Sequence, residues 1–308
     1  MGGLGEPASE WVRRCCPICG SNDESDVFAE ADVSVERLDA FAFASRKTPD
    51  HMHHRLIACR VCDLLYASPV PPAEIVVRAY RDAAFDSVAE AGYASRTYGR
   101  LLSGIVRALP DRVGALDIGT GEGSFLQELL AAGFTDIVGV EPSAAPISAA
   151  AQDIRPLIRH GVFDPDSFDD DAFSLVTCFQ TLEHLYDPQA MCRTAYRILR
   201  TGGAVFVVCH NRASLSARLL GMKSPIFDIE HLQLFSPRSA RTLLERSGFA
   251  DISIRRISNR YPLRYWTRLL PIPVALKRLS LSVLRSARLD GVPLALPAGN
   301  MAAIGYKR

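Results

Sequence analysis

The sequence predicts an α/β protein built on a doubly wound parallel sheet. From about residue 114 onwards, apolar strand-like segments alternate with amphipathic helical segments, a pattern typical of parallel sheets covered by helices. A glycine-rich turn follows the first of these strands, at residues 119–123, where such sheets bind ligands. Two Cys-x-x-Cys pairs near the N-terminus indicate a small additional module.

The composition is that of an ordinary globular protein. The chain has 308 residues, of which 48% are hydrophobic and 22% charged, and its net charge is +1. This balance gives no overall attraction to nucleic acid, and no apolar run approaches the roughly 20 residues that span a bilayer. The N-terminus lacks the basic and apolar regions of a signal peptide. We therefore expect a cytoplasmic protein, with a peripheral position at the inner membrane face left open.

Four cysteines predict a zinc-ribbon domain over residues 1–70. The two pairs are Cys16 with Cys19 and Cys59 with Cys62. Reduced thiols favour metal binding over disulfides, and four thiolates complete the tetrahedral shell that Zn²⁺ prefers. A closed shell of this kind is structural and performs no catalysis. Redox chemistry is disfavoured because neither pair opens a helix after a buried strand.

Two further expectations concern the region around the second cysteine pair. Alternating apolar residues at 56–58 and 64–66 predict flanking strands. His51, His53 and His54 lie in a polar loop, and we expect them to be solvated or to face a substrate.

Residues 71–113 are predicted to form a helical connection or lid. A proline-rich segment at 68–72 marks the boundary, and two stretches of helical apolar spacing follow it. Tyr80, Tyr93 and Tyr98 belong to these stretches. An aromatic stripe at helical spacing favours core packing, and the alternative that the tyrosines line a pocket stays open.

The segment 114–308 supplies the main domain. We expect strands at 136–140, 156–159, 173–179 and 204–209, with helices at 124–132, 144–153 and 188–199. A final strand at 301–306 is expected to pair antiparallel with residues 252–256. Glu141 ends the second strand, where an acidic side chain can accept hydrogen bonds from both ribose hydroxyls of a nucleotide.

Five sequence blocks resemble those of class I S-adenosylmethionine-dependent methyltransferases. Residues 117–123, DIGTGEG, are similar to the family's D/E-x-G-x-G-x-G signature. Residues 138–143, 173–184, 199–203 and 231–236 resemble further family blocks in the right order. The resemblance covers roughly residues 110–308 and implies a seven-stranded Rossmann-like methyltransferase sheet. A zinc-bearing front end also occurs in some members that act on sugars or natural products.

The resemblance implies a binding site for S-adenosylmethionine. It puts the glycines against the methionine and ribose, Glu141 on the ribose hydroxyls, Asp117 near the methionine ammonium, and Gln180 and Thr181 beside the methionyl group. The predicted cofactor residues are Asp117, Gly119, Thr120, Gly121, Gly123, Glu141, Pro142, Val162, Phe163, Gln180 and Thr181.

The predicted reaction is O-methylation of a small molecule such as a sugar, a lipid-linked compound or a natural product. The methyl donor is already activated, so positioning supplies much of the rate. A hydroxyl acceptor also needs a general base with a pKa near 7, for which histidine is suited. The candidates are His231, then His184, then His210. A carbon acceptor stays open as an alternative.

A basic segment over about 258–290 is predicted as an amphipathic insertion. Between Asp251 and Asp290 the chain has nine Lys or Arg and no Asp or Glu. This composition suits peripheral contact with an anionic membrane through 255–289. It equally suits a phosphate-bearing or lipid-linked sugar as substrate, or a helical cover over the active site.

Two other functions are alternatives to small-molecule methylation. An RNA methyltransferase with a zinc-bearing recognition domain should have a basic front end, whereas residues 20–40 are acidic, so nucleic acid is disfavoured as a partner. A non-catalytic zinc-ribbon interaction protein is the third alternative, which binding of S-adenosylmethionine would argue against.

Overall fold

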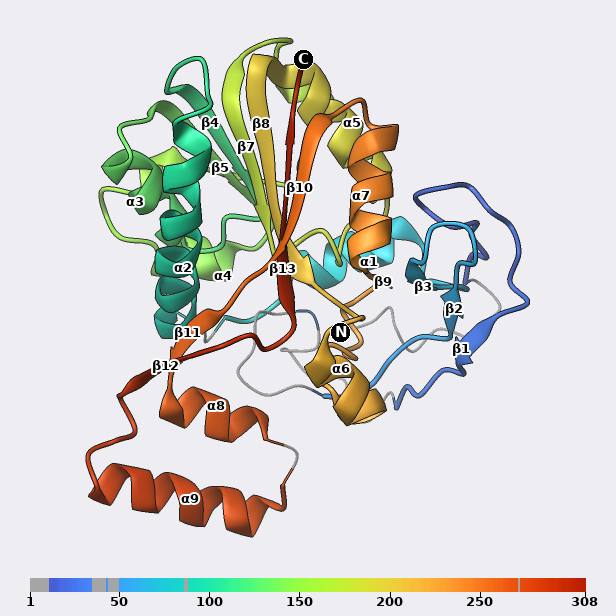
Figure 1. Ribbon diagram of the computed structural model, residues 1–308, viewed down its shortest axis with the longest axis vertical. Helices are drawn as coiled ribbons and strands as arrows, with labels where there is room; N and C mark the ends of the chain where they lie inside the picture. The colour runs from blue at the N-terminus through green and yellow to red at the C-terminus, as the bar shows by residue number, and fades with distance from the viewer. Residues whose placement is uncertain (1–10, 35–42, 44–49, 86–87, 271) are drawn as a thin grey trace.

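A computed structural model gives the fold of the protein. It describes residues 11–34, 43, 50–85, 88–270 and 272–308. A seven-stranded sheet occupies the centre, with helices on both of its faces (Figure 1). A four-stranded sheet lies to one side, and a helical hairpin projects from the end of the molecule where α6 also lies.

The central sheet has the strand order β10-β13-β8-β7-β4-β5-β6. Its strands are β4 (Val113–Ile118), β5 (Thr135–Glu141), β6 (Ile158–His160), β7 (Phe173–Phe179), β8 (Leu199–His210), β10 (Ala250–Arg256) and β13 (Asn300–Tyr306). Strands β4 to β8 pair in parallel, whereas β13 is antiparallel to both β8 and β10. The predicted doubly wound, seven-stranded sheet is therefore confirmed, with its switch point beside β4.

Helices cover both faces of the sheet, so its strands are apolar on both sides. Six of the seven residues of β7 are buried, as expected for a parallel strand between two helical layers. Helices α2 (Val88–Val106) and α3 (Ser124–Ala131) pack on one face. Helices α5 (Pro188–Ile198) and α7 (Pro237–Arg246) pack on the other.

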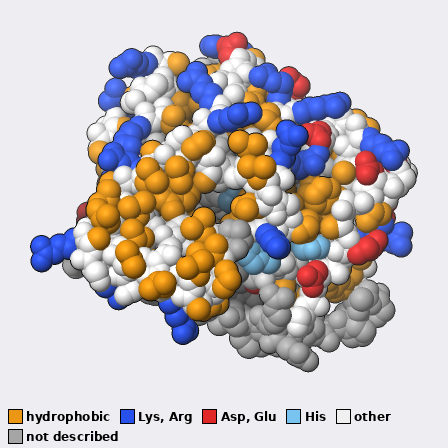
Figure 2. Space-filling model, turned by 60° about the horizontal axis from the view of Figure 1, so that its bottom comes forward, with side chains coloured by type: hydrophobic (Ala, Val, Ile, Leu, Met, Phe, Trp, Pro, Cys, Tyr) orange, Lys and Arg blue, Asp and Glu red, His pale blue; other side chains and the backbone are white. Residues whose placement is uncertain are grey.

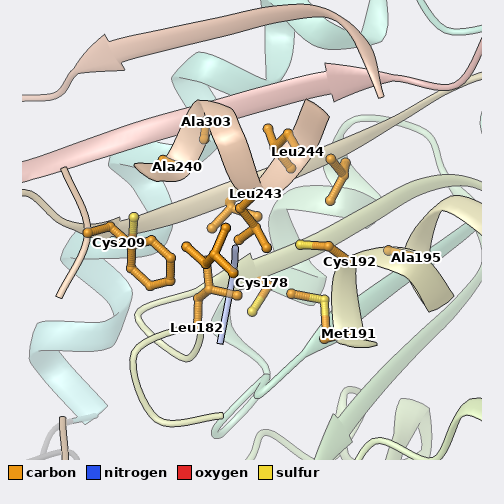
Figure 3. Close-up of a cluster of buried hydrophobic side chains, with 14 of the residues drawn as sticks. Cys178, Leu182, Met191, Cys192, Ala195, Cys209, Ala240, Leu243, Leu244 and Ala303 are labelled. Carbon is orange, nitrogen blue, oxygen red and sulfur yellow. The ribbon is translucent and has the colours of Figure 1, made fainter. Parts of the chain in front are cut away.

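The face under α5 and α7 holds three of the free cysteines. Figure 3 shows Cys178, Cys192 and Cys209 among Met191 and Leu243. All three cysteines are fully buried and behave as small apolar core residues. They are therefore separate from the four cysteines of the predicted metal site.

The helices begin where the sequence provides capping side chains. Asp187 accepts a hydrogen bond from Ala190 N at 2.8 Å at the start of α5. Ser236 and Ser239 form a reciprocal capping box at the start of α7. These contacts satisfy backbone donors that the first helical turn leaves unpaired.

The N-terminal sheet has the strand order β1-β2-β3-β9. Its strands are β1 (Val27–Ala29), β2 (Leu56–Ala58), β3 (Leu65–Ala67) and β9 (Gln233–Leu234). The predicted strands on either side of the second cysteine pair are confirmed as β2 and β3. Because β9 comes from the C-terminal half of the chain, the cysteine module shares its sheet with the predicted methyltransferase segment. The division at residues 70 and 113 stays a prediction.

A helical hairpin separates β10 from β13. It consists of β11 (Asn259–Pro262), α8 (Leu263–Leu269), α9 (Val274–Ser286) and β12 (Pro293–Leu296). Strands β11 and β12 pair antiparallel as a two-stranded sheet. Helix α9 has no buried residue. The segment predicted as an amphipathic insertion thus forms a projecting helical unit.

The remaining helices connect these parts. They are α1 (Ala73–Arg81), α4 (Ala144–Ala149) and α6 (Leu215–Leu220), with 3₁₀ turns at Arg155–Leu157, Pro165–Ser167 and Gly221–Lys223. The helix predicted over 144–153 is too long, because Ala150 takes an extended conformation with ψ of 144°. No helix within the described ranges has the length and apolar content needed to cross a membrane.

Candidate functional site

One cavity of about 810 Å³ lies at the carboxyl ends of the central strands. It brings together nearly all the residues that the sequence predicts as functional. Those lining it are Asp117, Gly119, Thr120, Gly121, Glu141, Pro142, Val162, Phe163, Gln180, Thr181, His184, His210 and His231. Gly123 lies outside the lining. Residues of the insertion, including Tyr265 and Trp266, also border the cavity.

The glycine turn between β4 and α3 has three glycines with different roles. All three have positive φ, at +73°, +58° and +79° for Gly119, Gly121 and Gly123. A side chain at Gly119 would collide with Thr181, and one at Gly123 would collide with Ile154. A Cβ at Gly121 would meet nothing within 4 Å. Gly121 therefore borders space that a ligand can fill, whereas Gly123 permits close packing beneath α3.

The carboxylate of Glu141 is held at the edge of the cavity. Its two oxygens accept hydrogen bonds from Gly121 N and Ser143 N, each at 2.9 Å. Burial raises the pKa of Glu141, although these backbone donors oppose the shift. The glycine turn and the acidic side chain are thus fixed to one another before any ligand binds.

Asp117 lies deeper in the same cavity. Thr177 Oγ1 donates to its Oδ1 at 2.6 Å. Burial raises the pKa of Asp117 to about 6, because desolvation disfavours the carboxylate. A cationic ligand group beside Asp117 would lower this pKa again, so the site is suited to an ammonium group.

Gln180 leaves β7 in a strained conformation. Its φ is +51°, a region that residues other than glycine rarely adopt. Its Nε2 is buried and has no hydrogen-bond partner within the described residues. Such strain and an unpaired donor are typical of a ligand-binding position.

The three predicted histidines lie side by side in the cavity. The ring centroids of His184 and His231 are 4.9 Å apart, and those of His210 and His231 are 5.1 Å apart. They come from the end of β7, the end of β8 and the segment before β9. The sequence blocks thus meet at one edge of the sheet, as parallel topology requires.

Hydrogen bonds indicate the tautomer of neutral His231. Its Nδ1 lies 2.8 Å from Ile226 O, a carbonyl oxygen that can only accept, so Nδ1 carries the proton and the lone pair is on Nε2. His184 Nδ1 lies 3.2 Å from Glu230 O and 2.9 Å from the hydroxyl of Tyr80, which can donate or accept. His210 Nδ1 lies 2.9 Å from Asn300 Oδ1.

His210 is a poor proton acceptor, because burial lowers its pKa to about 4. An effective general base has a pKa near the working pH, so His210 is the weakest candidate. His231 and His184 have a neighbouring carboxylate, since Glu230 Oε1 lies 3.9 Å from His231 Nε2 and Glu230 Oε2 lies 4.0 Å from His184 Nδ1. This carboxylate favours the protonated imidazole.

Three further residues, Tyr80, Glu183 and Glu230, belong to this cluster, and the sequence did not predict a role for them beside the histidines. Tyr80 OH lies 2.9 Å from His184 Nδ1 and donates to Glu230 O at 3.0 Å. Glu230 faces His184 and His231, and buried Glu183 accepts a hydrogen bond from His210 N at 2.5 Å. Glu230 directly precedes His231 in the sequence, which was a usable signal. The sequence left two alternatives open for Tyr80, core packing and lining a pocket. The structure supports the second, since Tyr80 lines the cavity.

The four predicted cysteine ligands also meet. Cys16 Sγ lies 3.5 Å from Cys62 Sγ, and Cys19 Sγ lies 3.4 Å from Cys59 Sγ. All four sulfur atoms lie within 4.8 Å of one another. Tetrahedral Zn²⁺ with bonds of about 2.3 Å needs sulfur atoms roughly 3.8 Å apart. The donor set and its spacing therefore fit a closed Zn²⁺ site.

The cysteine module is joined directly to the segment that carries His231. Ala67 N donates to Leu232 O at 2.8 Å, next to the pairing of β3 with β9. Half-buried Arg14 donates to Ala67 O at 2.8 Å and to Leu232 O at 2.6 Å. Burial lowers the pKa of this guanidinium to about 10, where it is still charged at neutral pH. The residue after His231 is thus held by the module from two sides.

The expectation that His53 and His54 are solvated is wrong. His54 is 1% exposed, and its ring packs edge-on against Trp11. Burial lowers the pKa of His54 to about 4. His53 is also buried, whereas His51 is exposed. The neighbouring strand β2 carries this segment into the interface with the C-terminal half, which its polar composition did not predict.

Comparison with known families identifies the class of the chain. A model described as a methyltransferase domain matches residues 92–254, just over half of the sequence. The chain therefore belongs to the methyltransferase-domain family. This match covers the glycine turn, Glu141 and all three clustered histidines.

Individual relatives are more distant. The ubiquinone biosynthesis O-methyltransferase of Pseudomonas aeruginosa is 32% identical over 108 residues, which are 32% of this chain and 44% of that protein. The match thus spans less than half the length of this curated relative. A SAM-dependent methyltransferase of Thermotoga maritima is 18% identical, covers 71% of this chain and 94% of its own, and superposes with a TM-score of 0.47. A SAM-dependent methyltransferase of Archaeoglobus fulgidus is also 18% identical. The match covers 69% of this chain and 94% of that protein, with a TM-score of 0.47.

Proposed function

We propose that the protein is an S-adenosylmethionine-dependent methyltransferase that methylates a hydroxyl group of a small molecule. One observation carries this proposal. The glycine turn with its carboxylates and the three clustered histidines line the same cavity. A methyl donor and a proton acceptor can therefore act on one substrate there.

S-adenosylmethionine fits the end of the cavity formed by β4 and β5. Gly121 leaves room for the cofactor, Glu141 accepts from the ribose hydroxyls, and Asp117 faces the methionine ammonium. Thr120, Pro142, Val162, Phe163 and Thr181 complete the proposed binding site, with Gln180 Nε2 as a donor beside the methionyl group. The bound cofactor supplies an activated methyl group.

His231 is the proposed general base. Ile226 O holds its Nδ1–H, so Nε2 can accept the proton from the acceptor hydroxyl as the oxygen attacks the methyl carbon. Glu230 Oε1, 3.9 Å from Nε2, then stabilises the imidazolium that results. His184 is the second candidate, and His210 is the third because of its low pKa.

Zn²⁺ is proposed as a structural ion held by Cys16, Cys19, Cys59 and Cys62. Four thiolates leave no open position for a substrate. The ion fixes the turns that carry the cysteines, and β3 connects these turns to β9 and the segment of His231. Its effect on catalysis is therefore indirect.

The proposed acceptor classes are a natural product, a phosphate-bearing sugar and a lipid-linked sugar. Similarity to an O-methyltransferase of ubiquinone biosynthesis from Pseudomonas aeruginosa supports oxygen as the methylated atom. Peripheral membrane contact through 255–289 belongs to the same proposal. We also propose the division into residues 1–70, 71–113 and 114–308.

A labelled-methyl screen tests this function. Purified protein is incubated with S-adenosylmethionine carrying a deuterated methyl group and with pools of sugars, lipids and phenols, and products are detected by mass. We expect a product with one labelled methyl group on oxygen. His231→Asn should lower turnover about 10²- to 10⁴-fold with cofactor affinity unchanged, and His160→Asn, an exposed histidine, is the matched control. Equal turnover in both variants would exclude His231 as the base.

A further inference from the structure

Two helices, α6 and α9, expose rows of leucine and valine. On α9, Leu276, Leu279 and Val283 share one face through their i, i+3, i+7 spacing, and Leu279 and Val283 are 60% and 58% exposed. On α6, Leu215 and Leu219 are 69% and 76% exposed. Single exposed apolar residues are common, but aligned rows on neighbouring helices indicate an interaction surface.

The same two helices carry only positive charge. Residues 252–289 contain nine Lys or Arg and no Asp or Glu. Arg278 and Arg285 are exposed on α9, and Arg218 and Lys223 are exposed on and after α6. On α9 the two arginines lie on the face opposite the apolar row, since Arg278 and Arg285 stand about 180–200° around the helix from Leu276. An apolar face with Lys and Arg on the opposite, polar face is typical of a helix that lies in the surface of an anionic bilayer.

Helices α6 and α8 border the cavity that holds the histidines, and α9 packs on α8. Tyr265, Trp266 and Leu269 of α8 line the cavity, as do Ser216 and Leu220 of α6. In Figure 1, α6, α8 and α9 lie at the same end of the molecule. Figure 2 turns this end forward and shows hydrophobic side chains gathered over it, with Lys and Arg side chains at the margins.

We propose that α6 and the α8–α9 hairpin dock on an anionic lipid bilayer, with the cavity opening between them toward the lipid. A second copy of the chain fits this surface less well. A two-fold interface brings the same patch of each copy together, so it would bring close to each other two segments that each contain nine Lys or Arg and no Asp or Glu. Like charges repel each other, whereas phosphate headgroups neutralise them.

The docked orientation defines the acceptor more closely. Resting on the proposed function, we propose an amphiphile whose apolar part stays in the bilayer or against α8. Its polar end then reaches His231, which lies in the same cavity as Tyr265 and Trp266. Tyr and Trp side chains, which combine an apolar ring with a polar atom, are enriched where an apolar environment meets water.

Vesicle flotation of the full chain tests the docking. Vesicles of phosphatidylcholine alone are compared with vesicles that contain one third phosphatidylglycerol. We expect flotation only with the anionic vesicles and its loss at high salt. The double variant Leu279→Glu with Val283→Glu should reduce bound protein at least tenfold, and Arg278→Glu with Arg285→Glu should do the same. The matched controls are Leu130→Glu and Arg107→Glu, at exposed positions on α3 and after α2.

The outcomes separate docking from catalysis. Circular dichroism establishes that each variant is folded, and calorimetry with S-adenosylmethionine should give unchanged affinity in all of them. The docking proposal is overturned if the wild-type chain does not float, or if the control variants lose flotation equally. It is also overturned if light scattering detects a dimer that Leu279→Glu dissociates while vesicles stay unbound. Failure to bind S-adenosylmethionine would instead contradict the proposed function.

Discussion

The N-terminal cysteine module and the C-terminal hairpin lie next to the same cavity, but they are attached to the molecule in opposite ways. The module shares its sheet with β9 and is joined to Leu232 O by Arg14. The hairpin is connected through the two-stranded sheet of β11 and β12, and α9 has no buried residue. One region is part of the core, and the other is a projecting surface unit.

This difference corresponds to two different tasks. A proton-transferring group must stay within a fraction of an ångström of its working position, and the module holds the segment next to His231. A region that receives a substrate can be loosely packed, because its contacts change as the substrate enters. Mutations in the two regions should therefore differ in the size and kind of their effects.

Loss of the predicted zinc site should have the largest effect. Structural zinc sites contribute about 10–16 kcal/mol of apparent binding energy in small domains. We expect Cys59→Ser to remove the metal, unfold the module and abolish methyl transfer, as measured by metal content and thermal unfolding. Cys15→Ser is the matched control because Cys15 is exposed and outside the cluster. Full metal content in Cys59→Ser would refute the proposed ligand set.

Replacement of Arg14 should have the next largest effect. Arg14→Met removes the guanidinium that donates to the carbonyl oxygens of Ala67, Tyr186 and Leu232, while Leu232 O keeps its bond from Ala67 N, and the change should cost about 3 kcal/mol. Denaturant unfolding measures this loss. Arg13→Met is the control and should change stability by less than about 0.5 kcal/mol, since the side chain of Arg13 is 82% exposed. Equal effects at the two positions would mean that the module is not anchored through Arg14.

The affinity for S-adenosylmethionine should depend on pH through Asp117. Its pKa is about 6 in the folded chain and 3.8 as the ordinary value. The folded apo-protein therefore binds a proton that the ligand ammonium must displace, so affinity should fall up to about tenfold per unit as pH drops below 6. Because the pKa of Asp117 is higher in the folded chain than its ordinary value, the free energy of unfolding of the apo-protein should fall as pH rises from about 4 to 6. Calorimetry at pH 5 and 7.5 measures the change, and Asp117→Asn should bind more weakly without this dependence.

Truncation on α9 should have the smallest effect on stability. Leu279→Ala removes little buried surface and should change the free energy of unfolding by less than about 0.5 kcal/mol. Leu243→Ala on α7 is the matched buried position and should cost about 2–5 kcal/mol. A large loss in Leu279→Ala would show that α9 is covered in solution.

Much of the fold could be predicted because its signals are local. The apolar run of β7, the glycine turn and the acidic end of β5 each lie within a few residues of sequence. The three histidines could be gathered in advance because strand ends of a parallel sheet meet at one edge. Their roles at the site, like those of the cofactor residues, are still proposals.

The parts of the fold and the site that the sequence did not predict depend on contacts between distant segments, which leave no periodic pattern in the sequence. Strand β9 has two residues, Gln233 and Leu234, too few for a pattern, so its pairing with β3 was not foreseen. The burial of His53 and His54 follows from this same packing. Glu230 and Tyr80 come from segments 150 positions apart in the chain, and only folding brings them to His184.

Calorimetric titration with S-adenosylmethionine tests the central claim most directly. The claim is that the glycine turn binds this cofactor and that His231 is not part of the cofactor's binding site. We predict one cofactor per wild-type chain, unchanged affinity in His231→Asn, and at least about a 100-fold loss in Gly119→Ala, whose side chain would collide with Thr181. Gly104→Ala, with nothing within 4 Å of the added Cβ, should bind normally. Absence of binding to the wild-type chain, or equal binding to Gly119→Ala, would contradict the account.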